Sequence, residues 1–175
     1  KNLFCNDQVL ALIAQVFNVD ASTLIVSEYQ FRVDEPHDKL YTLDWHQDGA
    51  YYDQDRDGKS GIVINVCIQD CNKNMGTPHL IKGSHKKGEL SLTKYAKQES
   101  NSLQYNTDAK HISEHNIITL EPKIGDVVLY DMNLIHRSGF NTSTKARFSA
   151  IARAFNPLSK NFVPYYFTGK KLLKF

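Results

Sequence analysis

The stretch Trp45-His46-Gln47-Asp48 organises the rest of this chain. Side chains alternate between the two faces of an extended strand, so we expect His46 and Asp48 to point the same way and Gln47 the other way. One imidazole and one carboxylate side by side supply two ligands for a divalent metal ion. A lone His-x-Asp pair also arises by chance in a chain with 7 His. The pair therefore gains meaning only if the chain supplies a third ligand.

The pattern of apolar residues around this stretch predicts a mainly β fold. A helix is expected to begin at Asp7 or Asn6, with apolar positions at helical spacing over residues 9–17. Strand patterns follow at residues 23–33, 45–48, 61–69, 78–81, 116–120, 126–131 and 146–155. One packing helix with short strands and no βαβ alternation favours an antiparallel sandwich or barrel, such as a cupin-like jelly roll.

His136 is the candidate for the third ligand, because a jelly roll brings strands together that are distant in the sequence. Two His and one carboxylate on one face leave coordination positions open, as in non-haem Fe(II) oxygenases. A structural zinc ion would prefer four protein ligands. We therefore predict that His46, Asp48 and His136 form a catalytic metal site.

Arg147 lies downstream of His136 in an otherwise apolar strand, where an inward guanidinium is costly without an anion. A guanidinium there could hold a dicarboxylate by two parallel hydrogen bonds. Ser138 and Ser149 stand two residues after His136 and Arg147, and either hydroxyl could complete the clamp. The alternative is a structural ion pair with Asp126 or Asp131. A structural role of that kind is what we expect for Arg153.

A set of short motifs resembles the phytanoyl-CoA dioxygenase family of Fe(II)/2-oxoglutarate oxygenases between residues 24 and 155. In chain order they are Trp45-His46-Gln47-Asp48, Asn74-Met75-Gly76, Lys82-Gly83-Ser84-His85, Gly125-Asp126, and His136 through Asn141 to Arg147. The family usually has Pro where this chain has Lys82. His85 is expected to be a structural residue of its turn.

The resemblance implies a double-stranded β-helix with iron held by His46, Asp48 and His136. Arg147 would bind the distal carboxylate of 2-oxoglutarate with help from Ser138. Asn65 falls where many members have a Trp beside the cosubstrate, and we expect it to contribute to that site.

The implied reaction uses O2 to hydroxylate a C–H bond of a small-molecule substrate while 2-oxoglutarate is decarboxylated to succinate. Candidate substrate-binding residues, chosen by position alone, are Gln30, Arg32, Tyr51 and Tyr52. Two alternatives stay open, a non-catalytic jelly-roll binding module and a cupin-type metal-dependent isomerase or hydrolase. The second would leave Arg147 and Ser138 unexplained.

Composition sets the remaining expectations. A chain of 175 residues fits one domain, residues 1–175. The helix over residues 9–17 is not preceded by the family's first elements, so some N-terminal sequence is expected to be missing. A net charge of +2 gives no nucleic-acid footprint, and no apolar run has the length of a membrane span. Three Cys argue against a disulfide framework and fit the cytoplasm. The acidic loop from Asp53 to Asp57 resembles the start of a calcium loop only in part, and residues 86–114 are expected to form a long loop near the site. The sequence does not indicate the oligomeric state.

Overall fold

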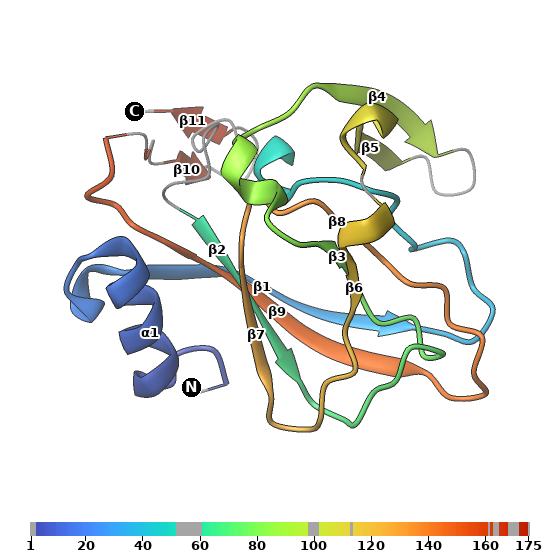
Figure 1. The fold of residues 1–175 in the computed structure, drawn as a ribbon. Coiled ribbons are helices and arrows are strands. Elements are labelled where there is room, and N and C mark those ends of the chain that lie inside the picture. The colour runs from blue at the N-terminus through green and yellow to red at the C-terminus, as the bar shows by residue number, and fades with distance from the viewer. Residues whose placement is uncertain are drawn as a thin grey trace.

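The computed structural model describes residues 3–51, 61–97, 102–112, 114–160, 162, 165–167 and 172–174. Figure 1 shows its elements in chain order. They are α1 (Asp7–Phe17), β1 (Ile25–Asp34), β2 (Gly61–Cys67), β3 (His79–Ile81), β4 (Leu92–Lys97), β5 (Ser102–Thr107), β6 (Ile117–Thr119), β7 (Val127–Asp131), β8 (His136–Arg137), β9 (Arg147–Phe155), β10 (Tyr165–Phe167) and β11 (Leu172–Lys174). Short 3-10 turns lie between several of them.

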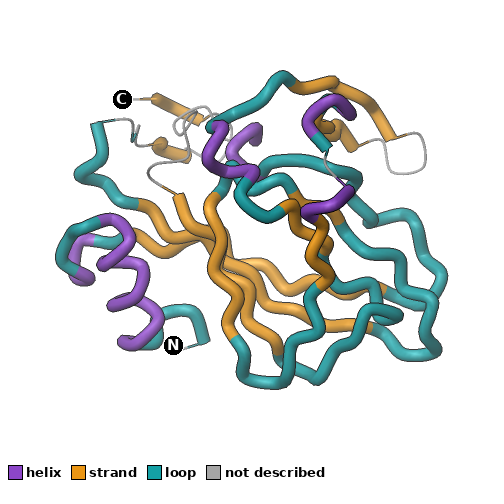
Figure 2. Tube along the Cα trace, viewed as in Figure 1, coloured by secondary structure: helices purple, strands orange, loops and turns teal. Residues whose placement is uncertain are grey.

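Two antiparallel sheets build the centre of the fold. The larger has the strand order β1-β9-β2-β7 and the smaller has the order β6-β3-β8. A bridge between His46 and His136 adds one more backbone segment beside β8. In Figure 2 the long strands of the larger sheet run side by side, with the short strands of the smaller sheet next to them. The mainly β fold with one helix near the N-terminus is therefore confirmed, and the arrangement is consistent with a double-stranded β-helix.

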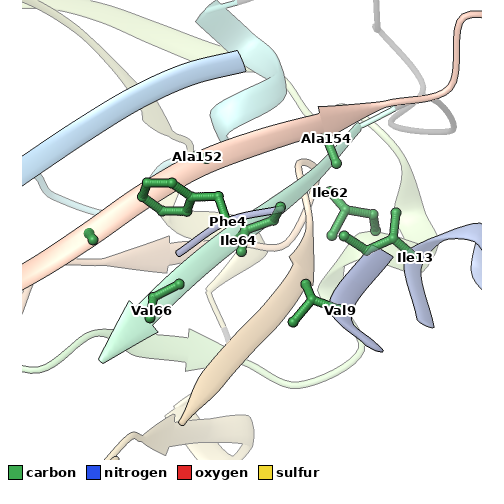
Figure 3. Packing of buried hydrophobic residues seen from close by; sticks show 9 residues of the cluster. Phe4, Val9, Ile13, Ile62, Ile64, Val66, Ala152 and Ala154 are labelled. Atoms are coloured by element: carbon green, nitrogen blue, oxygen red, sulfur yellow. The ribbon is translucent and has the colours of Figure 1, made fainter. Parts of the chain in front are cut away.

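The helix α1 covers one face of the larger sheet. Asn6 caps it by accepting hydrogen bonds from the backbone N–H groups of Gln8 and Val9, as the capping preference of Asn predicts. Val9 and Ile13 of α1 pack against alternate residues of the neighbouring strands, as Figure 3 shows. The sheet residues in this cluster are Ile62, Ile64 and Val66 of β2 and Ala150, Ala152 and Ala154 of β9. Each fully buried aliphatic side chain stabilises the fold by roughly 1.5–3 kcal/mol, so this face is a major source of stability.

The opposite face of the larger sheet points towards the smaller sheet and carries polar residues. On β9 these are Arg147, Ser149 and Arg153, which are buried. On β1 the alternation changes phase, because the register shifts between Ser27 and Gln30. Glu28 takes a left-handed conformation at this bulge, with φ +57. Residues after a bulge change sides relative to those before it, which explains an apolar pattern that fits no single period.

Two predictions of secondary structure are wrong. Residues 45–48 do not form a strand, because only His46 makes a β-bridge and Asp48 already begins a 3-10 turn, Asp48–Tyr51. Residues 86–114 are not simply a loop, because β4 and β5 pair there as an antiparallel hairpin. The calcium-like loop from Asp53 to Asp57 lies outside the described residues. Among the helices that are described, none has the length and apolar character needed to cross a bilayer.

Candidate metal centre

His46, Asp48 and His136 converge as predicted, although by a turn rather than by strand alternation. Oδ1 of Asp48 lies 3.4 Å from Nε2 of His46 and 3.5 Å from Nε2 of His136. One ligand atom from each residue lies within 4.8 Å of the other two, and all three residues are buried. In the described part of the chain this is the one such group of His, Cys, Asp and Glu side chains.

Backbone carbonyls orient both imidazoles for metal binding. Nδ1 of His46 lies 2.7 Å from the carbonyl of Asp44, and Nδ1 of His136 lies 2.9 Å from that of Leu134. A carbonyl only accepts, so each Nδ1 carries the proton and each Nε2 presents its lone pair to the centre. Burial and the nearby His46 lower the pKa of His136 to about 4. His136 is therefore neutral near pH 7, the form that binds a metal ion.

The second oxygen of Asp48 is held by an arginine. Oδ2 accepts a hydrogen bond of 2.8 Å from Arg153, which had been expected to pair with a structural Asp. Burial alone would raise the pKa of Asp48, but the adjacent His46 and His136 side chains and the charge of Arg153 hold it well below its usual range. Asp48 is thus a carboxylate with one oxygen committed to Arg153 and one facing the imidazoles. Two imidazoles and one carboxylate fit Fe(II).

A cavity of ≈ 90 Å³ adjoins the three ligands. It lies between the two sheets, because its walls include residues of β1, β2, β7 and β9 as well as β8. Besides the three ligands, six residues predicted from the sequence line it, namely Gln30, Arg32, Asn65, Ser138, Arg147 and Ser149. Tyr51 lies beside it, with its ring edge-on at 6.2 Å from the His46 ring. Tyr52 lies outside the described residues.

Arg147 pairs with Asp34 rather than with Asp126 or Asp131. The two residues are in register on β9 and β1, and the guanidinium donates a short hydrogen bond to Oδ2 of Asp34. Asp126 and Asp131 instead accept hydrogen bonds from backbone N–H groups. The alternative of a structural ion pair named Asp126 or Asp131 as the partner, and the structure gives Asp34 instead.

The same carboxylate also binds a second arginine. Nε of Arg32 donates to Oδ1 of Asp34 at 2.8 Å, and an amino group of Arg32 donates to Oγ of Ser138 at 2.8 Å. Two guanidinium groups thus share one carboxylate, which leaves this end of the cavity with a net positive charge. Within the described structure, Nε of Arg147 and Oγ of Ser149 are buried without a hydrogen-bond partner. Buried polar atoms without partners are uncommon, and these two fit the carboxylate of an anionic ligand.

The other motif residues support the strands that carry the ligands. Oγ of Ser84 accepts a hydrogen bond of 2.8 Å from the N–H of Ile135, next to the ligand His136. Gly76 has φ +76, and a Cβ there would lie 3.0 Å from the backbone of Asn141. The Asn141 side chain in turn donates a hydrogen bond of 2.8 Å to the carbonyl of Asp34. These contacts connect the turn at Ser84 with the backbone beside His136, and the turn at Gly76 through Asn141 with Asp34.

Three residues at the site were not predicted, namely Asp34, Tyr130 and Arg153. Tyr130 lines the cavity, and its ring lies 5.0 Å from the ring of His136. Burial raises the pKa of Tyr130, so its hydroxyl stays protonated. Strand alternation could have identified two of the three. Asp34 faces the same side of β1 as Arg32, and Arg153 faces the same side of β9 as Arg147, because each pair is separated by an even number of positions.

Comparisons with known proteins agree with this geometry. The sequence model of the phytanoyl-CoA dioxygenase (PhyH) family matches residues 2–149. The comparison with curated protein sequences found no match.

Three solved structures share the fold. EvdO2 from Micromonospora carbonacea var. aurantiaca complexed with 2-oxoglutarate is 18% identical, with a TM-score of 0.68 over 87% of this chain and 61% of that chain. The non-heme monooxygenase ThoJ in its apo form is 20% identical, with a TM-score of 0.67 over 94% and 57%. The epimerase SnoN in complex with Fe3+, alpha ketoglutarate and nogalamycin RO is 14% identical, with a TM-score of 0.64 over 86% and 56%.

This chain thus spans between half and two thirds of the length of these solved chains. Structural similarity at such low identity shows a common fold, whereas the family match rests on the sequence itself and extends over most of it. On that match, this chain belongs to the phytanoyl-CoA dioxygenase family.

Proposed function

We propose that this chain is the domain of a non-haem Fe(II)/2-oxoglutarate oxygenase that hydroxylates a C–H bond of a small molecule. One observation carries the proposal. A three-ligand metal site and a buried, cationic group of side chains line the same cavity, the first beside Arg153 and the second around Arg147 of β9. A metal-binding module would need only the first, and a hydrolase would have no use for the second.

The three ligands support iron binding. Two imidazole Nε2 atoms and one carboxylate oxygen converge on one point, and the carbonyls of Asp44 and Leu134 fix the imidazole tautomers. Such a set leaves coordination positions open for other molecules. Bound iron would supply the activation of O2, coupled to the decarboxylation of 2-oxoglutarate to succinate.

The cationic end of the cavity supports binding of the cosubstrate. Nε of Arg147 and Oγ of Ser149 are buried polar atoms at this end that can bind a carboxylate, and Arg32 and Ser138 also line the cavity. Asp34 keeps the guanidinium of Arg147 in place by pairing with its amino group. Charge-assisted hydrogen bonds of this kind are stronger than neutral ones, so a dicarboxylate is the ligand that best matches this end.

The substrate is proposed to approach past Gln30 and Tyr51, which border the cavity and the His46 ring. The three ligand residues are buried, and burial of this kind would limit the access of water to the reacting groups. The free thiols of the three cysteines support a reducing, cytoplasmic setting, and we treat residues 1–175 as one domain.

The test is an anaerobic titration of the purified protein with Fe(II) and 2-oxoglutarate, followed by the weak visible charge-transfer band of the resulting complex. We expect a saturable band in the wild-type protein and its loss in His136→Ala. Phe148→Ala is the control and should keep the band. Phe148 follows Arg147 on β9, but its side chain is exposed on the face of the strand that points away from the cavity. The absence of a band in folded, iron-loaded wild-type protein would overturn the proposal and favour a binding module or a cupin-type enzyme.

A further inference from the structure

We propose that Arg153 is a positioning residue that makes Asp48 a one-oxygen metal ligand. This inference rests on the metal site of the proposed function. Arg153 would hold Oδ2 of Asp48 away from the metal ion, so that only Oδ1 binds it. One coordination position that a two-oxygen carboxylate would fill then stays open for cosubstrate, oxygen or water.

The geometry separates the roles of the two oxygens. Oδ1 of Asp48 lies 3.4 and 3.5 Å from the two imidazole Nε2 atoms, where a shared metal ion would sit. Oδ2 lies 2.8 Å from an amino group of Arg153. A carboxylate that binds a metal through both oxygens must turn both towards the ion. The hydrogen bond from Arg153 opposes that rotation.

The position of Arg153 makes it a rigid support. Its backbone is in register with Ser27 of β1 on one side and with Val63 of β2 on the other. Its side chain is buried, with 9% of its surface exposed. Groups on the central strands of a sheet hold a neighbouring ligand more exactly than groups on loops do. The Asp48 segment is a 3-10 turn, so its carboxylate gains orientation from this contact.

A second arginine on the same strand supplies a matched comparison. Arg147 and Arg153 lie on the same face of β9, both line the cavity, and each donates to a buried Asp. The partner of Arg147 is Asp34, which is not a metal ligand. Loss of either arginine removes one buried guanidinium from β9, but only loss of Arg153 releases a metal ligand.

The experiment measures Mn(II) binding by the electron paramagnetic resonance signal of the free ion, in protein without 2-oxoglutarate. Removal of a group that orients a metal ligand typically costs 10–100-fold in metal affinity. We expect Arg153→Met to weaken Mn(II) binding by about that factor and Arg147→Met to leave it unchanged. Arg153→Lys keeps a cationic donor and should fall between Arg153→Met and the wild type.

A second readout reports the coordination itself. The visible absorption spectrum of bound Co(II) depends on the number and geometry of its ligands. We expect Arg153→Met to change this spectrum, because the freed carboxylate can bind through both oxygens or detach. Arg147→Met should keep the wild-type spectrum.

Two results would overturn the inference. One is wild-type Mn(II) affinity together with a wild-type Co(II) spectrum in folded Arg153→Met. The other is an equal loss of Mn(II) affinity in Arg147→Met, which would mean that both arginines only maintain the sheet. If Arg153→Met fails to fold, Arg153→Lys decides, and wild-type affinity with an unchanged Co(II) spectrum in that variant would overturn the inference.

The outcome is separable from that of the proposed function. Wild-type protein that binds Mn(II) but not 2-oxoglutarate would contradict the oxygenase assignment and leave the comparison of the two arginines intact. Wild-type protein that binds no divalent metal would overturn both.

Discussion

The two faces of β9 are both largely buried and are chemically opposite. The residues under α1 are Ala150, Ala152 and Ala154, each 0% exposed. The residues facing the cavity include Arg147 and Arg153, which are 4% and 9% exposed. Burial by itself therefore does not separate the core of this protein from its candidate site. The difference lies in what each face gains from burial.

The alanine face gains stability, because small side chains let α1 pack closely against Ile62 and Ile64 of β2. The arginine face gains little stability, because the desolvation of a buried ion pair offsets most of its attraction. What it holds instead are oriented charges and buried atoms without a hydrogen-bond partner within the described structure, which include Nε of Arg147 and Oγ of Ser149. Substitutions on the two faces should therefore have separable effects on stability and on ligand binding.

The largest effect is expected in the apolar cluster under α1, which includes the alanine face of β9 and Ile64 of β2. Ile64 is 0% exposed in the cluster under α1, so Ile64→Ala should lower the free energy of unfolding by about 2–5 kcal/mol. Urea denaturation measures this loss. Affinities for Mn(II) and 2-oxoglutarate in the fraction that stays folded should match the wild type. Weakened ligand binding in folded Ile64→Ala would show that the two faces are not independent.

The next effect is expected on the arginine face. Arg147→Met should weaken 2-oxoglutarate binding by roughly 10–100-fold, the cost of charge-assisted hydrogen bonds to a buried ligand. Its effect on unfolding should be smaller than that of Ile64→Ala, because Asp34 keeps its ion pair with Arg32 at 2.7 Å. Isothermal titration of the metal-loaded protein and urea denaturation measure the two quantities. Unchanged 2-oxoglutarate affinity would contradict the cosubstrate role of Arg147.

These two faces also show what the sequence could and could not predict. The metal ligands were identified because their chemistry is fixed by residue type and by motif. Their convergence did not depend on the predicted strand, since Asp48 starts a turn. Arg147 was identified because an arginine in an apolar strand needs an anion.

The partners of both arginines could not be predicted, because they depend on long-range geometry. Arg147 meets Asp34 only through the pairing of β9 with β1, across 113 positions in the sequence. Arg153 meets Asp48 across 105 positions, through a turn that local propensity does not specify. The bulge between Ser27 and Gln30 decides which residues of β1 face the cavity. The local sequence contains no pattern that predicts the position of this bulge. Pairing and register of distant strands therefore account for most of what was missed.

A smaller effect should follow from changing the cap of the helix that covers the alanine face. The side chain of Asn6 accepts from the N–H of Gln8 at 2.9 Å. Asn6→Ala should lower the free energy of unfolding by about 1 kcal/mol, while Asn6→Asp should retain most of the stability. Thermal denaturation measures the difference as a shift of about 2–4 °C in Tm. Equal stability of Asn6→Ala and the wild type would mean that packing alone holds α1 in place.

The smallest expected effect concerns Cys67, which pairs with Ser149 across β2 and β9 and lies on the same side as the cavity. Burial raises the pKa of its thiol from 9.0 to about 11, with Cys71 and Asp126 acting in the same direction and Arg147 against them. Between these values the folded protein holds a proton that the unfolded chain has lost. The stabilisation is therefore complete below pH 9 and disappears as the pH rises towards 11.

We expect a loss of less than about 1 kcal/mol between pH 8 and pH 9.5, measured as the difference between wild type and Cys67→Ala in urea denaturation at both pH values. A thiol on the cavity side that behaves in this way is an inert, buried group. The positive charge of Arg147 then reduces the effect of burial on Cys67 without cancelling it. An equal pH dependence in wild type and Cys67→Ala would show instead that the field of Arg147 reaches Cys67 and cancels the effect of burial.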